Sequence, residues 1–139
     1  MSELELARRC AEKMYAGDRA SQAMGIKVSV PAAGAAVATM TVREDMLNGF
    51  NICHGGIVCV LADTAFAFAC NAYDQLTVAA GAQLDFIRPG MLGDELTAVA
   101  TEDYRGKKTG FYTIRISNQR QEQVALFRGR SASRAEKLL

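Results

Sequence analysis

The chain has 139 residues with nearly balanced charge, 16 Lys and Arg against 15 Asp and Glu, for a net charge of +1. This length fits a single domain over residues 1–139, and the lack of a basic run argues against nucleic-acid binding. The longest apolar run carries Asp63 near its centre and the first residues have no apolar core, so neither a membrane span nor a signal peptide is expected. We expect a soluble cytoplasmic protein.

Residues 1–24 are predicted to form an N-terminal helical segment. Apolar residues recur at helical spacing over residues 4–16, and Gly17 can end that helix. The stretch "DRASQAMG" can add a short second helix, with Asp18 as its cap and Gly25 as its stop.

The apolar period then changes to two, which predicts strands over residues 26–30 and 35–42. Residues 55–72 are too long for one strand and rich in Ala, Leu and Phe, so they are predicted to form a buried central helix. Four further strands are expected after Asp74, at 77–88, 94–104, 109–118 and 122–132. A helix that is apolar nearly all round needs cover, so we expect an α+β fold in which one long curved antiparallel β-sheet wraps around it.

The start of the central helix is the first candidate for chemistry. Gly55 and Gly56 have no side chains, so a ligand can approach the backbone closely there. The first N–H groups of a helix lack partners within it and suit a developing oxyanion, although the two glycines can also serve only tight packing.

Asp63 is the second candidate, because a carboxylate in an apolar segment must be hydrogen-bonded, paired or reached by water in a cleft. It can act as a general base or a nucleophile beside an apolar acyl group, or simply bond a nearby backbone group. Gly55 and Asp63 are eight residues apart, ~12 Å along one helix. One carbonyl carbon cannot reach both, so either the two residues serve different tasks or Asp63 works with the helix start of a second copy. We favour the second alternative, a dimer with two antiparallel helices and two composite sites.

Several other residues are candidates with a plain structural alternative. Asn48 can position a water molecule or the substrate carbonyl, or form a turn with Gly49. His54 can contact the substrate or orient the loop. The remaining candidates are two aromatic residues for an acyl pocket and three cations for phosphate groups, with core packing and a solvated surface as their alternatives: Phe50, Phe66, Arg88, Lys107 and Lys108.

Other chemistries are not supported by the sequence. No nucleophile-elbow G-x-S-x-G, phosphate-binding G-x-x-x-x-G-K-[ST] or G-x-G-x-x-G motif occurs. The four cysteines form no C-x-x-C pair and the chain has one histidine, so no metal site is expected. We interpret Cys59 and Cys70 as small buried thiols, and Cys53 as an improbable nucleophile because neighbouring side chains in an extended loop point apart.

The segments "LNGFNICHGGIVCVLADTAFAFACN", "LDFIRPG", "GDELTA", "GKKTGFY" and "VALFRGRS" resemble the hotdog-fold acyl-CoA thioesterases of the phenylacetic-acid-degradation type. The resemblance spans roughly residues 10–133. It implies hydrolysis of phenylacetyl-CoA, hydroxyphenylacetyl-CoA or a related aryl-acyl-CoA, with no metal or redox cofactor. It further implies that the Gly55 N–H polarises the thioester carbonyl and that Asp63 of the other subunit activates water or attacks directly.

By the same resemblance, Asn48 and His54 support the carbonyl or the water, and the protein forms a dimer of dimers with coenzyme A along the subunit interface. Some relatives have a Ser or Thr on the strand after the central helix, and this chain offers no clear equivalent around Thr77. Two alternatives remain open: a hydratase or dehydratase of acyl-thioesters, which needs a His–acid pair, and a non-catalytic acyl-CoA-binding module.

Overall fold

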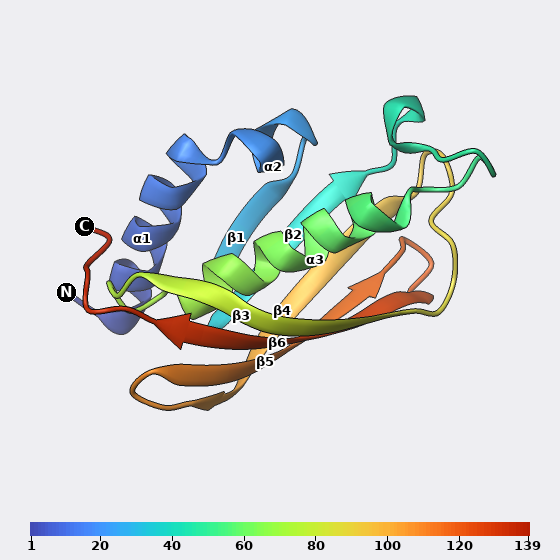
Figure 1. Cartoon of the computed structure of the whole chain (residues 1–139). Helices are drawn as coiled ribbons and strands as arrows, with labels where there is room; N and C mark the ends of the chain where they lie inside the picture. Colours follow the sequence, from blue (N-terminus) through green and yellow to red (C-terminus); the bar gives the residue numbers. More distant parts are fainter.

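The computed structural model describes all residues 1–139 (Figure 1). Its main element is a single antiparallel β-sheet. Its six strands lie in the order β1-β2-β4-β5-β6-β3. Their bounds are Lys27–Ala32 for β1, Ala35–Thr41 for β2, Thr77–Phe86 for β3, Glu95–Arg105 for β4, Thr109–Ser117 for β5 and Gln123–Ser133 for β6. All six agree with the predicted strands to within two residues at either end.

The long helix α3, Gly55–Cys70, lies across the concave face of this sheet (Figure 1). It begins at the predicted residue and ends two residues before the predicted end. Asn71 ends it, because the Asn71 side chain donates to the carbonyl oxygens of Ala67 and Thr77 and accepts from the Thr77 N–H, each at 2.9 Å. These bonds turn the chain directly from α3 into β3.

The core lies between α3 and the sheet. The period-two pattern of β2 is confirmed, since one of its two alternating sets is buried against the helix: Ala36, Ala38, Met40 and Val42, the last just past the strand's end. Leu61, Ala62 and Ala65 supply the buried side of α3. Burying such contiguous apolar surface contributes roughly 25 cal/mol per Å² removed from water, which is the main stabilising contribution to this packing.

Two short helical elements complete the N-terminal segment. Helix α1, Glu3–Gly17, begins with a capping box between Ser2 and Glu5, and packs beside β1. Helix α2, Arg19–Ala23, is capped by the Asp18 side chain as predicted. A 3-10 turn, Glu44–Met46, leads from β2 into the loop before α3.

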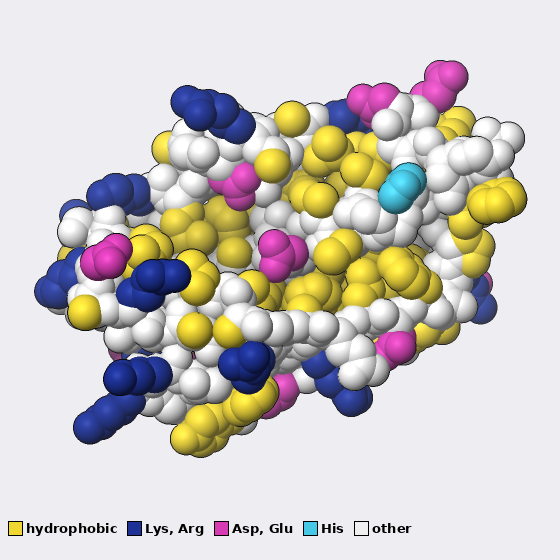
Figure 2. All heavy atoms as spheres, in the orientation of Figure 1, with side chains coloured by type: hydrophobic (Ala, Val, Ile, Leu, Met, Phe, Trp, Pro, Cys, Tyr) yellow, Lys and Arg dark blue, Asp and Glu magenta, His cyan; other side chains and the backbone are white.

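The sheet covers only one side of α3, which differs from the expectation of a helix enclosed all round. The opposite side of α3 stays open between α1–α2 and β3, and the outer edge of β3 pairs with no other strand. Figure 2 shows hydrophobic side chains gathered along this open face, on both sides of an acidic side chain. No helix of the chain is both long and apolar enough to cross a membrane.

Candidate active site

The N-terminus of α3 presents one free backbone donor. His54 is the N-cap, and its Nδ1 accepts the Gly56 N–H at 2.9 Å. The N–H groups of Ile57 and Val58 donate to the His54 carbonyl oxygen. The Gly55 N–H is left as the first donor of the helix without an intrahelical partner, at its positive end.

This cap assigns a tautomer to His54. A ring nitrogen that accepts a hydrogen bond carries no proton, so neutral His54 holds its proton on Nε2. His54 therefore has a structural role in the helix start, which is the alternative weighed for it from the sequence. The Gly56 N–H is occupied by the cap, so Gly56 offers a substrate only its lack of a side chain.

A pocket of about 350 Å³ opens beside Gly55. It brings together three of the predicted residues, Asn48, Gly55 and Arg88. Its apolar lining includes Phe86 and Ile87, which are 59% and 54% exposed and which sequence reasoning did not select. Their signal was available: two large apolar residues in succession at a strand end cannot both face the core.

Asn48 holds the loop in front of this pocket. Its Oδ1 accepts the N–H groups of Phe50 at 2.9 Å and of Ile52 at 3.3 Å, so the oxygen serves the turn. Its Nδ2 makes no hydrogen bond within the chain and remains a donor for a ligand. Phe50 is 84% exposed beyond the pocket and lines no part of it in the single chain.

The predicted cations do not converge. Arg88 lines the pocket, with Nε 3.7 Å from a Glu122 carboxylate oxygen and Nη1 3.5 Å from the Gln123 carbonyl oxygen. Lys107 and Lys108 lie in the turn between β4 and β5, at the opposite end of the sheet from the start of α3 (Figure 1). One chain therefore offers Arg88 alone of the three beside Gly55.

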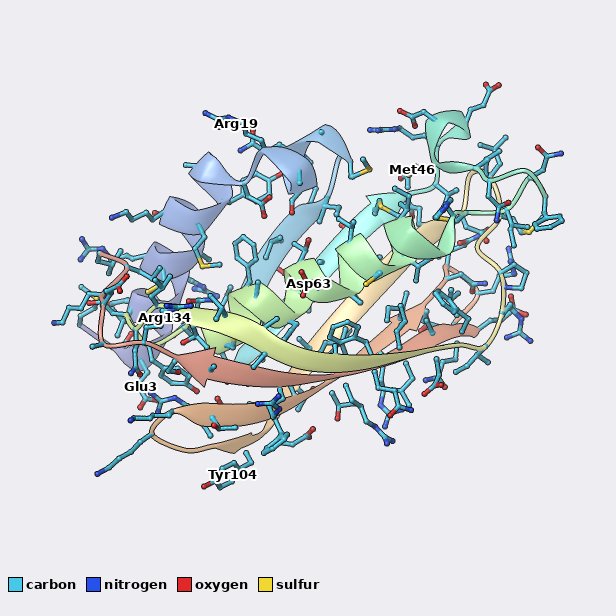
Figure 3. All side chains as sticks on the ribbon, in the orientation of Figure 1. Glu3, Arg19, Met46, Asp63, Tyr104 and Arg134 are labelled. Atoms are coloured by element: carbon cyan, nitrogen blue, oxygen red, sulfur yellow. The ribbon has the colours of Figure 1, made fainter.

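Asp63 lies midway along α3 on its open face (Figure 3). The side chain is exposed, and its carboxylate takes part in none of the chain's ion pairs, which involve Asp45, Asp94 and Glu122. Water reaches the carboxylate from the open side, but the apolar atoms around it desolvate it in part, which raises the pKa of Asp63, and the negative charge of Asp18 raises it further. A carboxyl group that holds its proton more tightly is the stronger base once ionised.

Phe66 lies in the core, contrary to its predicted place in an acyl pocket. It is 1% exposed, and its ring packs 5.5 Å from that of Tyr112 and 5.8 Å from that of Phe127. A Cβ atom added to Gly129 would lie 2.7 Å from this ring, so Phe66 fills the space above a glycine of β6. Core packing, the alternative given from the sequence, is its role.

The cysteines supply no nucleophile. All four are free thiols, and Cys53, beside the pocket, is 4% exposed. Burial raises the pKa of Cys53 to about 11 and that of Cys70 to about 12. Because the thiolate is the reactive form, neither reacts readily at neutral pH.

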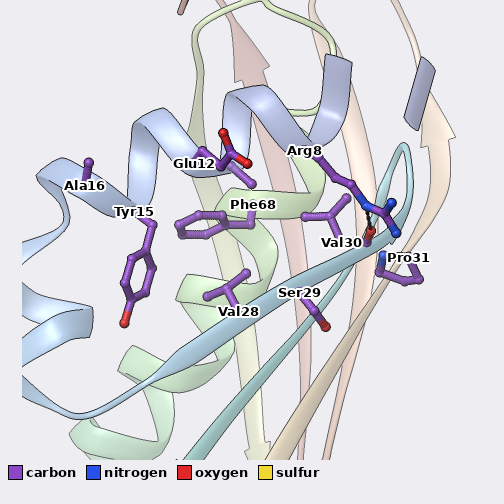
Figure 4. A pocket seen from close by; sticks show the side chains of 10 residues that line it. Arg8, Glu12, Tyr15, Ala16, Val28, Ser29, Val30, Pro31 and Phe68 are labelled. Atoms are coloured by element: carbon purple, nitrogen blue, oxygen red, sulfur yellow. Dashed lines mark hydrogen bonds between the residues drawn. The ribbon is translucent and has the colours of Figure 1, made fainter. Parts of the chain in front are cut away.

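Another groove, of about 700 Å³, lies between α1 and β1 (Figure 4). Phe68, Tyr15 and Val28 line it, and Arg8 Nε donates across it to the Val30 carbonyl oxygen at 3.2 Å. None of the predicted site residues borders it. The pocket at Gly55, although smaller, is the one that combines a free backbone donor with a polar side chain and an apolar wall.

Comparison with known proteins agrees with this geometry. Residues 50–125 match the family model described as "Thioesterase superfamily". The chain is 51% identical over 121 residues to the acyl-coenzyme A thioesterase PaaI of Escherichia coli, a match that covers 87% of this chain and 86% of that protein.

Solved structures give the same result. The E. coli PaaI protein from the phenylacetic acid degradation operon superposes with a TM-score of 0.96 at 47% identity, covering 98% of this chain and 99% of that one. The TT0310 protein of Thermus thermophilus superposes with a TM-score of 0.79 at 36% sequence identity, and the match covers 83% of this chain and 97% of that one. The chain therefore belongs to the thioesterase superfamily, which confirms the predicted family, the hotdog fold and the assignment as a thioester hydrolase.

Proposed function

We propose that this protein is an acyl-CoA thioesterase that hydrolyses phenylacetyl-CoA, hydroxyphenylacetyl-CoA or a related aryl-acyl-CoA to the free acid and coenzyme A. The observation that carries the proposal is the unpartnered N–H of Gly55, at the start of α3 and beside a pocket with an apolar wall. The similarity to a curated acyl-CoA thioesterase supports the same substrate class.

The chemistry follows from charge development in the transition state. Attack on the thioester carbonyl places negative charge on its oxygen, which the Gly55 N–H and the positive end of α3 stabilise. Asp63 either removes a proton from the attacking water or attacks the carbonyl itself. If Asp63 is the base, the water oxygen bonds to the carbonyl carbon, the carbon–sulfur bond breaks, and the proton taken by Asp63 passes to the sulfur, so that the free acid and the coenzyme A thiol leave. If Asp63 is the nucleophile, the carbon–sulfur bond breaks as an acyl–Asp63 anhydride forms; water then hydrolyses the anhydride, which releases the free acid, restores the Asp63 carboxylate and supplies the proton that the thiolate takes up. The free Nδ2 of Asn48 can hold the carbonyl or the water from the loop.

We propose that each site is shared between two chains. Gly55 and Asp63 are separated by ~12 Å along one helix, so one carbonyl cannot contact both in a single chain. The open face of α3 carries hydrophobic side chains on both sides of an acidic one, and the outer edge of β3 is unpaired, so we expect a second copy to pack on this side of the molecule. Two antiparallel α3 helices would place each Asp63 toward the start of the partner's helix.

Phosphate binding by Arg88, Lys107 and Lys108 also stays a prediction. Arg88 already lies at the pocket. The two lysines lie too far from Gly55 in their own chain to share its ligand, so they would have to act from another subunit. We also propose a dimer of dimers, a reaction that needs no cofactor, and a cytoplasmic location.

The hydratase alternative is weakened by the role of His54. A His–acid pair needs an imidazole nitrogen that can take a proton from the substrate, whereas Nδ1 of His54 accepts the Gly56 N–H and Nε2 of the neutral ring already carries a proton. Asp63 lies more than two helical turns away in the same chain. The geometry therefore favours hydrolysis.

The test is thiol release from phenylacetyl-CoA by the parent and by the Asp63→Asn variant. Loss of a general base should lower kcat by about 10²–10⁴-fold. Asp45→Asn is the matched control, because Asp45 is an exposed carboxylate paired with Arg43 away from the pocket. An Asp63→Asn enzyme with kcat within about threefold of the parent would exclude Asp63 as the catalyst. A parent that binds the thioester without hydrolysing it would identify a binding module.

A further inference from the structure

A buried polar chain joins the short helix α2 to the residue after Asp63. The Asp18 carboxylate caps α2 by accepting the Ser21 N–H at 3.0 Å, and it also accepts the Ser21 hydroxyl at 2.7 Å. Ser21 Oγ lies 3.0 Å from Thr64 Oγ1, and Thr64 donates to the Val60 carbonyl oxygen at 2.7 Å. Ser21 is 2% exposed and Thr64 7%, so the two hydroxyl groups are shielded from water, while Asp18 at the end of the chain is half-buried.

The protons of this chain can be counted. Three oxygen–oxygen contacts run from the Asp18 carboxylate through two hydroxyls to the Val60 carbonyl. A carboxylate and a carbonyl only accept, and each hydroxyl donates once. Two protons are therefore available for three contacts. When Ser21 donates to Asp18 and Thr64 donates to the Val60 carbonyl oxygen, no proton is left for the contact between the Ser21 and Thr64 oxygens.

Asparagine at position 18 would remove this deficit. Its Oδ1 would accept the Ser21 N–H as the carboxylate does, and Asn ranks with Asp as a helix N-cap. Its Nδ2 would donate to Ser21 Oγ, which frees the Ser21 proton for Thr64 Oγ1. In cap geometry and in hydrogen bonding Asp18 therefore supplies nothing that asparagine lacks. What it adds is a negative charge.

Two hydrogen-bonded contacts, Asp18 to Ser21 at 2.7 Å and Ser21 to Thr64 at 3.0 Å, fix this charge near the turn of α3 that carries Asp63, because Thr64 is the next residue after Asp63. We propose that Asp18 is an electrostatic positioning residue for Asp63: its fixed carboxylate opposes ionisation of the Asp63 carboxyl group and makes it a stronger base. For catalysis this inference rests on the proposed thioesterase function.

The other groups around Asp63 do not offset this effect. Cys59 and Cys70, on the same helix, interact with Asp63, and burial raises the pKa of both thiols, so they stay neutral. From the elements packed against α3, Asp18 is the one charged group that shifts Asp63, and it acts in the same direction as burial.

The experiment combines Asp18→Asn with Ser21→Ala in the full-length protein. The Asp63 carboxyl carbon is followed by ¹³C NMR from pH 3 to 8, and is assigned as the signal missing from Asp63→Asn. In Asp18→Asn we expect the midpoint of this titration to fall below that of the parent, because the negative charge that opposes ionisation is removed. Ser21→Ala disturbs the same polar chain but keeps the Asp18 charge, so its midpoint should stay at the parent value. The low-pH limb of kcat/KM for phenylacetyl-CoA should move with the NMR midpoint.

Thermal melting gives an independent readout of the proton count. Asp18→Asn should melt at or above the parent temperature, whereas Asp18→Ala, which loses the cap, should melt lower. An unchanged Asp63 midpoint in Asp18→Asn, or an equal shift in Ser21→Ala, would overturn the proposal. The NMR arm does not depend on turnover, so a parent that fails to hydrolyse thioesters would refute the proposed function and leave the coupling between the two aspartates to be decided on its own.

Discussion

A Cβ atom added to Gly55 would lie 3.0 Å from Cζ of Phe86 and 3.3 Å from its Cε1. The aromatic ring at the end of β3 thus lies directly against the first residue of α3. Both residues border the same pocket. The glycine lets the ring and a ligand approach the free N–H together, which a larger residue would prevent.

Gly55→Ala should therefore impair catalysis. The added methyl group must displace the Phe86 ring or enter the space of the thioester carbonyl, and we expect kcat/KM for phenylacetyl-CoA to fall at least about tenfold, as for a weakened oxyanion donor. Gly49→Ala is the matched control, because a Cβ atom there meets nothing within 4 Å. Equal activity of the two variants would contradict an oxyanion role for Gly55.

His54 is expected to act through its cap. In His54→Asn, the Asn Oδ1 can accept the Gly56 N–H in place of Nδ1, so stability in urea should stay close to that of the parent. His54→Ala loses the acceptor and should cost about 1 kcal/mol of unfolding free energy. We also expect His54→Asn to keep most thioesterase activity. Complete loss of turnover with an intact fold would instead assign His54 a direct chemical role.

The pH dependence should report the raised pKa of Asp63. Burial and the Asp18 charge shift this pKa upward from 3.8. A base or nucleophile must be ionised, so kcat/KM should decline as pH falls through the shifted value, and the low-pH limb should lie above 3.8. Rates measured across pH 3.5–8 locate this limb. Its loss in a slow Asp63→Asn enzyme would assign it to Asp63.

The parts of the site that could be predicted from the sequence are those determined by residues next to one another in the chain. The start of α3 and the cap of α2 were predictable, because glycines and capping residues act within one helical turn. The core position of Phe66 and the contact of Phe86 with Gly55 were not, although two large apolar residues in succession at the end of β3 indicate that one of them faces away from the core. Phe66 lies about 60° around the helix from Asp63, and only the curvature of the sheet decides which of the two is covered. Phe86 meets Gly55 through tertiary packing, and the length of the β4–β5 hairpin places Lys107 far from the pocket.

Phe66 and Phe50, the two aromatic residues predicted from the sequence to line the acyl pocket, should differ clearly in how much their replacement by alanine lowers the unfolding free energy. Phe66→Ala removes a core side chain that is 1% exposed and should cost about 3–5 kcal/mol of unfolding free energy. Phe50→Ala, at a position 84% exposed, should change stability by no more than about 0.5 kcal/mol. Chemical denaturation measures both. A small cost for Phe66→Ala would contradict the core assignment.

If each site is shared between two chains, two inactive variants should restore activity when they are combined in one dimer, whereas sites within single chains would not. An Asp63→Asn chain keeps the helix start, and a Gly55→Val chain keeps the aspartate, so each homodimer should be inactive in both of its sites. When the two chains are coexpressed at equal levels, about half of the dimers are mixed. In a mixed dimer one site receives the intact Gly55 from one chain and the intact Asp63 from the other, while the second site receives both defects. Thiol release should recover to about one quarter of the parent rate, since half of the dimers have one of two sites restored.

If both residues served one site within a single chain, no mixture would restore activity, and the rate would stay at the level of the separate variants. Purification of the mixed dimer with two different affinity tags should raise the recovery to about one half per dimer, because every molecule then carries one complete site.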